Sequence, residues 1–446
     1  MRRSLYILLI SCVAALGGMM FGFDVAIISG AAPFVQIHFA LSELQLGWGV
    51  SSLLAGCMLG AAFAGRCADL YGRRRSLWGV ALIFALTSLW TALAATFWSF
   101  VAARFIGGVA VGAASMISPL YIAESTPKAL RGRMVSLNQL AVTGGILVSY
   151  GINYLLRDIG SQNWRWMFAT GAVPSLFFFT MLFLAPESPR WLLRAGREEE
   201  ARTVWSRICD ADEASAEIEA IQSPSEEAPS TPWRELLSSR HWRVMTVGVL
   251  LAVLVQITGV NTIIDYAPII LGSTGVSVDA ALFQTFVIGF INFAFTFFAI
   301  FTVDKLGRRN LYMIGSAGMT IALVGLSAEF LTGGARGYAA LALILLFIAS
   351  FAACIGPVFW VLMSEIFPGR IRGLAMSVAV FVCWFANFAV VLLFPWLLKN
   401  LGGGATFGFL ALMSLAMLLL AWKTLPETRG RSLEEIEAHW DNLNRR

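Results

Sequence analysis

Hydrophobic residues occur along the whole chain in long runs that are separated by short charged stretches. We count twelve runs of about 20 residues or more, enough for each to cross the roughly 30 Å hydrocarbon core of a bilayer as a helix. The runs lie at 6–30, 44–67, 76–97, 98–122, 136–156, 165–185, 243–271, 280–303, 310–332, 338–363, 373–397 and 405–424. The pattern predicts an all-α membrane protein with twelve transmembrane helices.

Composition supports this interpretation, because 58% of the 446 residues are hydrophobic and only 13% are charged. A mean hydropathy of +0.74 is typical of a polytopic membrane protein and excludes a soluble globular enzyme. The first apolar run continues to Gly30 without a small-residue cleavage site, so we expect a first transmembrane helix rather than a signal peptide.

Lysine and arginine are distributed unequally between the two sides of this arrangement. If both termini are cytoplasmic, 27 of the 32 lie on the cytoplasmic side, as the positive-inside rule requires. The chain contains no Asn-x-Ser/Thr sequon, which agrees with a bacterial inner membrane. We expect a monomer in the lipid bilayer with no nucleic-acid partner. The spacing of the cysteines and histidines predicts neither a disulfide framework nor a metal site, and we expect no cofactor.

Three charged motifs occur twice, in the same order and at nearly the same separation. The first motif is GRCADLYGRRR at 65–75 and recurs as DKLGRR at 304–309. The second is a glutamate followed seven residues later by an arginine, at Glu124 and again at Glu365. The third is PESPR at 186–190, which recurs as PETR at 426–429. Their offsets of 235, 241 and 240 residues indicate a duplication. We therefore predict two six-helix halves at 1–186 and 243–424, a linker with short helices at 187–242, and a cytoplasmic tail at 425–446.

The paired acids and arginines of these motifs are candidates for cytoplasmic gating. Carboxylates and guanidinium groups at helix ends form charge-assisted bonds, which we interpret as latches that open and close during a conformational cycle. An alternative is that the arginines only enforce topology. The gating candidates are Asp69, Arg73, Glu124, Arg131, Glu187, Arg190, Asp304, Arg308, Glu365, Arg372, Glu427 and Arg429.

Together with the QxxGxN stretch at 256–261, these motifs carry a family resemblance over nearly the whole chain. The sequence resembles the sugar porter family of the major facilitator superfamily, and within it the bacterial proton–sugar symporters. The resemblance implies the major facilitator fold and transport of a sugar.

One acid and one arginine lie at matching depth inside predicted helices. Asp24 and Arg104 are each six residues, or about 9 Å, from the outer end of their helix. Charges in hydrocarbon are costly unless they are paired, so a functional role is the default interpretation. We predict that Asp24 is a proton site coupled to Arg104, the role that the resemblance also implies. The alternative is an ion pair that only holds two helices together.

A sugar site needs amides, hydrogen-bond partners and aromatic faces. The polar and aromatic residues at positions where the resemblance implies sugar contacts are Phe21, Gln139, Gln256, Asn261, Asn292, Trp360 and Trp384. Each amide could instead form an interhelical hydrogen bond, and each tryptophan could simply pack. Gly259 predicts a break in the seventh helix beside this set.

The chain departs from the family pattern at four of the implied contact positions. Val255 replaces a glutamine, Asp265 replaces the first of two tyrosines, and Ile146 and Cys383 stand where one proton-coupled member of the family carries glutamines. Asp265 lies one helical turn after Asn261, so we include it among the substrate-binding candidates. Its alternative role is to cap a helix end in water at the outer mouth.

The sequence as a whole predicts proton-coupled symport of a monosaccharide (hexose or pentose) or a polyol by alternating access. An uncoupled facilitative uniporter is the first alternative. A non-transporting sugar sensor is the second, although only about 22 residues follow the last predicted helix. No nucleophile and base constellation indicates an enzyme.

Overall fold

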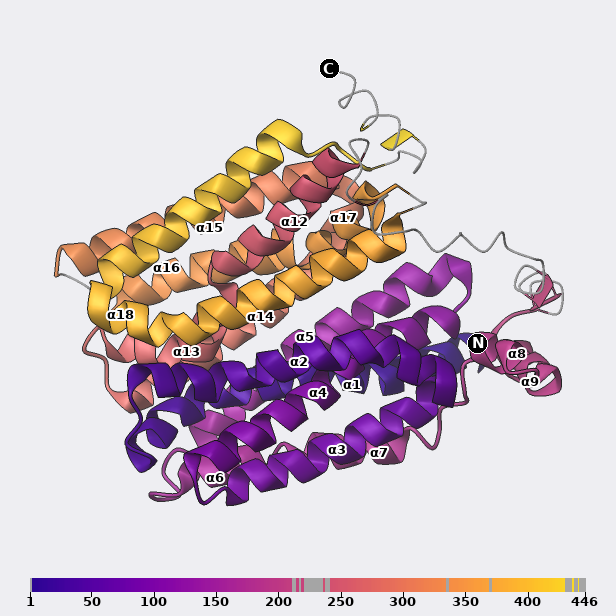
Figure 1. Ribbon diagram of the computed structural model, residues 1–446, viewed down its shortest axis with the longest axis horizontal. Coiled ribbons are helices and arrows are strands. Elements are labelled where there is room, and N and C mark those ends of the chain that lie inside the picture. Colours follow the sequence, from indigo (N-terminus) through magenta and orange to yellow (C-terminus); the bar gives the residue numbers. More distant parts are fainter. Residues whose placement is uncertain are drawn as a thin grey trace. The chain divides into compact units, whose positions relative to one another are not determined.

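The computed structural model describes residues 2–210, 241–333, 337–368 and 371–429, with short pieces at 214–215, 218–219, 236, 435–436 and 440. Within these residues the regular structure is helical and contains no β-strand, as the hydrophobic pattern predicts (Figure 1). The chain divides into two compact units, Met1–Phe39 with Ser52–Glu227 and Ala40–Ser51 with Ala228–Arg446. Half of the residues of the predicted linker and tail lie outside the described ones, including the Pro- and Ser-rich stretch 223–232.

In its described residues, unit 1 contains five long helices and four short ones. The long helices are α1 (Arg2–His38), α2 (Glu43–Tyr71), α3 (Arg73–Leu93), α4 (Phe97–Glu124) and α5 (Lys128–Leu156). Two short helices, α6 (Asn163–Ala169) and α7 (Ala172–Met181), come next. The short helices α8 (Pro189–Arg194) and α9 (Glu198–Ile208) follow them. The division assigns the first two turns of α2 to unit 2.

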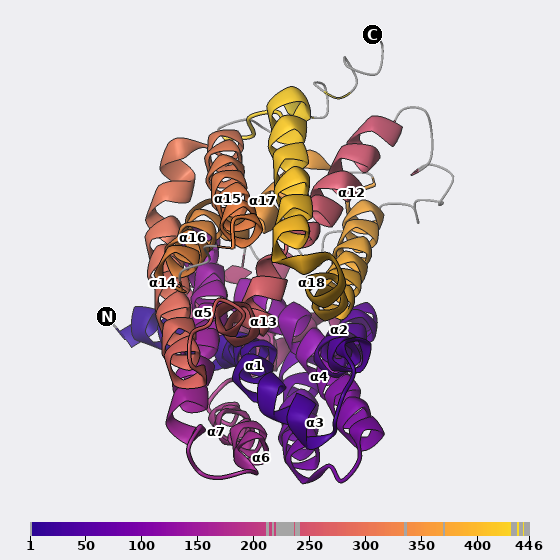
Figure 2. The same cartoon turned by 90° about the vertical axis from the view of Figure 1, so that its left-hand side faces the viewer.

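Unit 2 contains the remaining helices. They are α12 (Trp242–Ile257), α13 (Val260–Gly272), α14 (Val278–Leu306), α15 (Arg308–Leu331), α16 (Gly337–Ser350), the π-helix η1 (Phe351–Ile355), α17 (Gly356–Ile366) and α18 (Arg372–Thr424). Within this unit α18 packs along both α12 and α15, as Figure 2 shows in yellow, rose and orange.

The described helices account for the twelve predicted membrane spans. Ten stretches are long and apolar enough to cross a membrane, and α18 is counted among them once. A non-helical residue, Gly402 with φ 77°, divides α18 into two helices, which agrees with the predicted break between 397 and 405. The helices α6 and α7 are each too short to span alone and together form the sixth predicted segment. The nine stretches other than α18, the two parts of α18 and the α6–α7 pair together give twelve spans.

Small residues allow the helices of unit 1 to approach closely. Gly22 in α1 lies against the main-chain carbonyl of Val142 in α5, where an added Cβ would collide with that oxygen. Helix association in lipid depends on such close contact, because lipid tails are as apolar as the side chains they replace. The contact fixes α1 next to α5 and thereby positions the following turn of α1, which carries Asp24.

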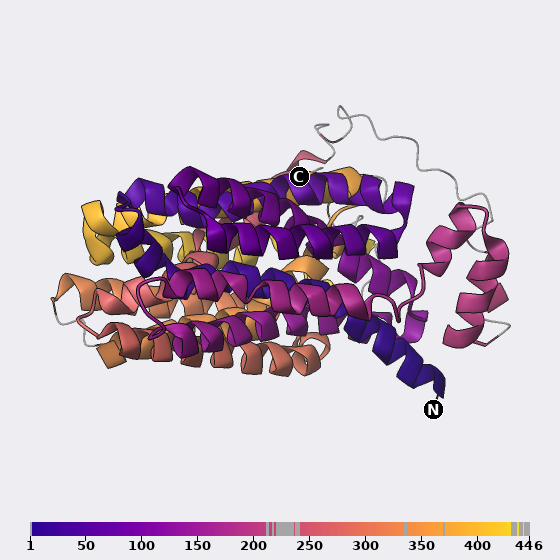
Figure 3. The ribbon, with the colours of Figure 1, turned by 90° about the horizontal axis from the view of Figure 1, so that it is seen from below.

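The short helices α8 and α9 form a satellite of unit 1 next to the N-terminal end of α1 (Figure 3). Trp191 and Trp205 form the centre of their apolar core. Ile208 packs against Ile7 and Ile10 of α1, and Arg3 forms an ion pair with Asp210. The N-terminal turns of α1 therefore stabilise the linker helices by burying their apolar face.

Candidate transport site

Asp24 of α1 and Arg104 of α4 form an ion pair inside unit 1. Arg104 Nη1 lies 2.8 Å from Asp24 Oδ1 and 3.3 Å from the main-chain oxygen of Asp24. The exposed fractions are 7% for Asp24 and 2% for Arg104, so both charges are removed from solvent. The matching depth in the sequence therefore corresponds to direct contact in the structure.

This ion pair uses only one guanidinium nitrogen. Among the described residues, Arg104 Nε and Nη2 have no hydrogen-bond partner. The guanidinium carbon lies 5.4 Å from the ring centroid of Phe168 in α6, which provides a cation–π contact on one face. A pair with one nitrogen lacks the second parallel bond of a bidentate arginine–carboxylate pair, so the relative orientation of the two groups is less restricted.

A chain of polar contacts crosses the break in the seventh membrane helix. The amide of Asn261 donates to Gln256 Oε1 at 2.9 Å, and Gln256 Nε2 lies 3.1 Å from Cys383 Sγ in α18. The break is where the sequence predicts it: α12 ends at Ile257, Gly259 has φ 84°, and α13 begins at Val260. Cys383 was not among the predicted site residues, because only its position in the family pattern, and no property of a lone cysteine, marked it.

Asp265 is buried in α13, with an exposed fraction of 2%. This burial contradicts the alternative in which the carboxylate caps a helix end in water. The next residue, Tyr266, donates a hydrogen bond from its hydroxyl to the carbonyl of Val391 at 3.0 Å and stacks on Phe394. These contacts attach this turn of α13 to α18.

The remaining predicted sugar contacts are distributed over both units. In unit 1, Phe21 of α1 and Gln139 of α5 are half-buried. In unit 2, Asn292 of α14 and Trp384 of α18 are buried, whereas Trp360 of α17 is 42% exposed. The amides thus lie on helices that are otherwise apolar, where a polar side chain needs either a helix partner or a polar ligand.

A charged network lies at one end of unit 1. The guanidinium of the buried Arg73 approaches the two carboxylate oxygens of Glu124 at 2.8 and 2.9 Å and Asp69 at 3.0 Å. Glu187 Oε1 accepts hydrogen bonds from the main-chain N–H groups of Arg73 and Arg74 at 2.8 and 3.0 Å. The network therefore links the ends of α2, α3 and α4 to the segment before α8.

The second copy of the motifs forms a corresponding network in unit 2. Glu427 accepts hydrogen bonds from the N–H groups of Arg308 and Arg309 at 2.9 and 3.2 Å. Arg308 Nε lies 3.6 Å from Glu365 Oε2, to which Thr428 also donates. The glutamate at the helix start and the arginine–glutamate contact of unit 1 thus have counterparts in unit 2, where the arginine–glutamate distance is longer.

The pairing expected from the seven-residue spacing is absent in this structure. Arg131 donates to the carbonyl of Ala123 at 3.0 Å, and Arg372 donates to the carbonyl of Phe367 at 3.2 Å, instead of to Glu124 and Glu365. The reason is that carbonyls at helix C-termini lack intrahelical partners and attract nearby arginines.

Three gating candidates remain. Arg429 donates to the carbonyl of Lys305, and Arg190 is half-buried in α8. The side chain of Asp304 lies outside the described ones.

A twelve-helix fold with a buried acid–arginine pair and duplicated charged loops defines a membrane transporter of the major facilitator type. The family model described as "Sugar (and other) transporter" matches residues 10–440. The chain belongs to this family, and it is a transporter rather than an enzyme.

Several characterised members of this family are similar over their full length. The D-xylose-proton symporter of Escherichia coli (strain K12) is 39% identical, over 98% of this chain and 96% of the relative. The arabinose-proton symporter of Bacillus subtilis (strain 168) is 36% identical, over 98% and 95%. A solved inward-open conformation of the xylose transporter from E. coli has a TM-score of 0.86 at 38% identity, covering 97% of this chain and 100% of that chain.

Proposed function

We propose that this chain carries a monosaccharide into the cell together with a proton, with Asp24 as the proton site and Arg104 as its partner. The observation that carries the proposal is the buried ion pair, whose oxygen and nitrogen are 2.8 Å apart. Relatives whose names describe proton-coupled uptake of xylose and arabinose support it.

The proton step follows from the charges of the pair. While Asp24 is ionised, its carboxylate satisfies one nitrogen of Arg104 and the two charges compensate each other. A proton on Asp24 removes the negative charge, and the single hydrogen bond then holds α1 and α4 together less strongly. Protonation therefore favours a conformation in which Arg104 is not paired with Asp24, and so it shifts the conformational equilibrium.

The sugar is recognised by amide and aromatic side chains of both units. Gln256 and Asn261 already bond to each other, so their donors and acceptors are held in a fixed relation to a ligand hydroxyl. Phe21, Gln139, Asn292, Trp360 and Trp384 supply further contacts, and Asp265 accepts bonds from adjacent hydroxyls. A hexose, a pentose or a cyclic polyol fits this chemistry.

The charged networks control the packing of each unit during the cycle. Arg73 with Glu124 and Arg308 with Glu365 join helix ends that have to separate if a unit changes shape. The longer second distance places the weaker contact in unit 2. We propose that alternating access proceeds by breaking and re-forming these contacts.

The remaining assignments concern the placement of the chain in the cell. We propose that the protein resides in a bacterial inner membrane as a monomer with both termini cytoplasmic, because lysine and arginine concentrate on that side. The functional halves are 1–186 and 243–424, the linker is 187–242, and the tail is 425–446.

An uptake panel in proteoliposomes tests the proposal. Radiolabelled pentoses, hexoses and cyclic polyols are offered with and without an inward proton gradient. Symport predicts that one of them accumulates above equilibrium only when the gradient is present. Equal rates and no accumulation under both conditions would favour the uncoupled uniporter, in which the Asp24–Arg104 pair is structural.

A further inference from the structure

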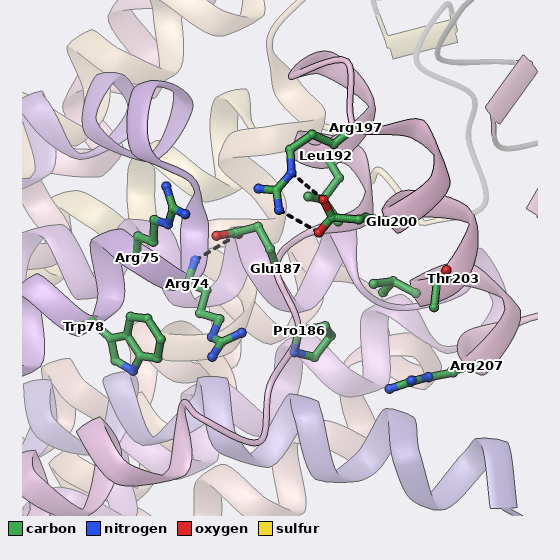
Figure 4. A pocket seen from close by; sticks show the side chains of 11 residues that line it. Arg74, Arg75, Trp78, Pro186, Glu187, Leu192, Arg197, Glu200, Thr203 and Arg207 are labelled. Atoms are coloured by element: carbon green, nitrogen blue, oxygen red, sulfur yellow. Dashed lines mark hydrogen bonds and ion pairs between the residues drawn. The ribbon is translucent and has the colours of Figure 1, made fainter.

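A pocket that contains none of the candidate sugar contacts lies in unit 1 between the first turns of α3 and the short helices α8 and α9 (Figure 4). Its volume is about 430 Å³, and its lining includes Arg74, Arg75, Trp78, Glu187, Arg197 and Arg207. None of the roles assigned above to the transport cycle uses the four arginine side chains that line it.

The two carboxylates of this pocket are already engaged. Arg197 binds Glu200 through two nitrogens at 2.7 and 2.6 Å. Glu187 accepts hydrogen bonds from main-chain N–H groups at the start of α3. No described carboxylate forms an ion pair with the guanidinium groups of Arg74, Arg75 or Arg207, and the four arginines and two glutamates of the pocket together leave a net charge of +2.

Arg74 is held in position before any ligand arrives. Its guanidinium carbon lies 4.4 Å from the ring centroid of Trp78, and the indole of Trp78 donates to the carbonyl of Phe179 at 3.2 Å. The Nε atom of Arg74 is buried and has no hydrogen-bond partner among the described residues. Figure 4 shows Arg207 extending from α9 toward the same space from the opposite side. Two guanidinium groups on separate elements thus converge on one volume.

We propose that this pocket binds the phosphate group of a small molecule or a lipid headgroup at the cytoplasmic face of the transporter. Guanidinium forks match phosphate oxygens in two-bond geometry and are weakly hydrated, so they bind this group better than other common anions. Enforcement of topology explains why arginines lie on this side, but it requires neither a concave arrangement nor a guanidinium that stacks on an indole and has a buried Nε atom.

The size of the pocket restricts the ligand. Sites for small organic molecules have volumes of about 300–1,000 Å³, so the pocket holds a phosphate group with a short organic portion. A phosphorylated metabolite in the cytosol and the headgroup of phosphatidic acid both present this chemistry. Either ligand would link α3 to α9 through Arg74 and Arg207 and so stabilise the attachment of the linker helices.

Two binding measurements on the full-length protein distinguish these sources. In detergent, glycerol 3-phosphate is titrated by calorimetry, with glycerol as the uncharged control. In nanodiscs, retention of phosphatidic acid against phosphatidylcholine is counted by native mass spectrometry. The variants are Arg207→Gln, the double variant with Arg74→Gln, and the control Arg194→Gln, which removes an exposed arginine of α8 outside the pocket.

We expect Arg207→Gln to weaken binding about tenfold, the double variant to weaken it further, and Arg194→Gln to leave it unchanged. This pattern with glycerol 3-phosphate assigns the site to a soluble ligand, and with phosphatidic acid it assigns the site to a lipid. Absence of binding in both measurements, or an equal response of the pocket and control variants, overturns the proposal. Neither readout depends on sugar uptake.

Discussion

Glu187 and Glu427 occupy equivalent positions in the two units, although they are 240 residues apart in the chain. Each carboxylate accepts hydrogen bonds from two consecutive arginine N–H groups at the start of a membrane helix, α3 for Glu187 and α15 for Glu427. The N–H groups of a helix's first turn lack partners, and the helix dipole favours negative charge there. The duplicated sequence therefore preserves a helix cap in addition to an ion pair.

Replacing Glu187 by alanine is expected to destabilise unit 1. The substitution leaves the N–H groups of Arg73 and Arg74 without their acceptor, at a cost of roughly 1.5–3 kcal/mol for a bond to a charged group. Thermal unfolding of the purified protein in detergent measures the loss, and Glu199→Ala in the exposed first turn of α9 is the control. Equal unfolding temperatures for the two variants would contradict a capping role.

Asp24→Asn is expected to abolish accumulation driven by a proton gradient while preserving exchange of substrate across the membrane. The amide keeps the shape of the side chain and imitates the protonated, uncharged state beside Arg104. Counterflow and gradient-driven uptake in the same proteoliposomes separate the two activities. If the variant still accumulates substrate fully, Asp24 is not the coupling group.

Arg73→Gln is expected to disturb the protein far more than Arg131→Gln. The first change leaves Glu124 without its two-bond partner, and breaking such a buried pair costs about 3–5 kcal/mol. The second removes one bond to the Ala123 carbonyl, worth about 1 kcal/mol.

Labelling measurements test the same pair of variants for a gating role. A cysteine introduced at Gln139, with the native cysteines removed, is labelled by an impermeant reagent from the cytoplasmic side. We expect a larger change in labelling for the Arg73 variant at a temperature where both variants are folded. A larger change for Arg131→Gln would restore the pairing expected from the sequence spacing.

Asp265→Asn is expected to weaken substrate affinity about tenfold, or about 1.4 kcal/mol, if the carboxylate binds ligand hydroxyls. The burial of Asp265 in α13 agrees with a contact sheltered from water. Exchange rates measured over a range of substrate concentrations give the apparent affinity. An unchanged value, for the substrate that the uptake panel identifies, would place Asp265 outside the site.

The membrane helices were predictable because hydrophobic length is a strong local signal. The break at Gly259 and the division between 397 and 405 were also visible, since glycine permits backbone angles that other residues avoid. The docking of Ile208 on Ile7 and Ile10 was not predictable, because it depends on how α9 folds back toward α1. Sequence periodicity marks an apolar face but does not identify its partner.

The Asp24–Arg104 contact was predictable because two charges in apolar helices have few other ways to be compensated. The partner of Glu124 could not be chosen from the sequence, since several arginine candidates lie near it and only tertiary packing selects Arg73. The contact of Cys383 with Gln256 was missed for a related reason. A thiol is a weak hydrogen-bond group, and only its neighbours in the folded structure show that it contacts a site residue.

The left-handed backbone at Gly259 provides a hinge directly before the first residue of α13. This helix is about 20 Å long, so a rotation of about 10° at its first residue would carry its far end through about 3 Å. An added methyl group at Gly259 would lie 2.8 Å from Leu410, and its backbone angles would be strained as well, so the pivot tolerates little besides glycine. Asn261, Asp265 and Tyr266 lie on this one helix, so a change at Gly259 would shift all three together, against the contacts that attach Tyr266 to α18.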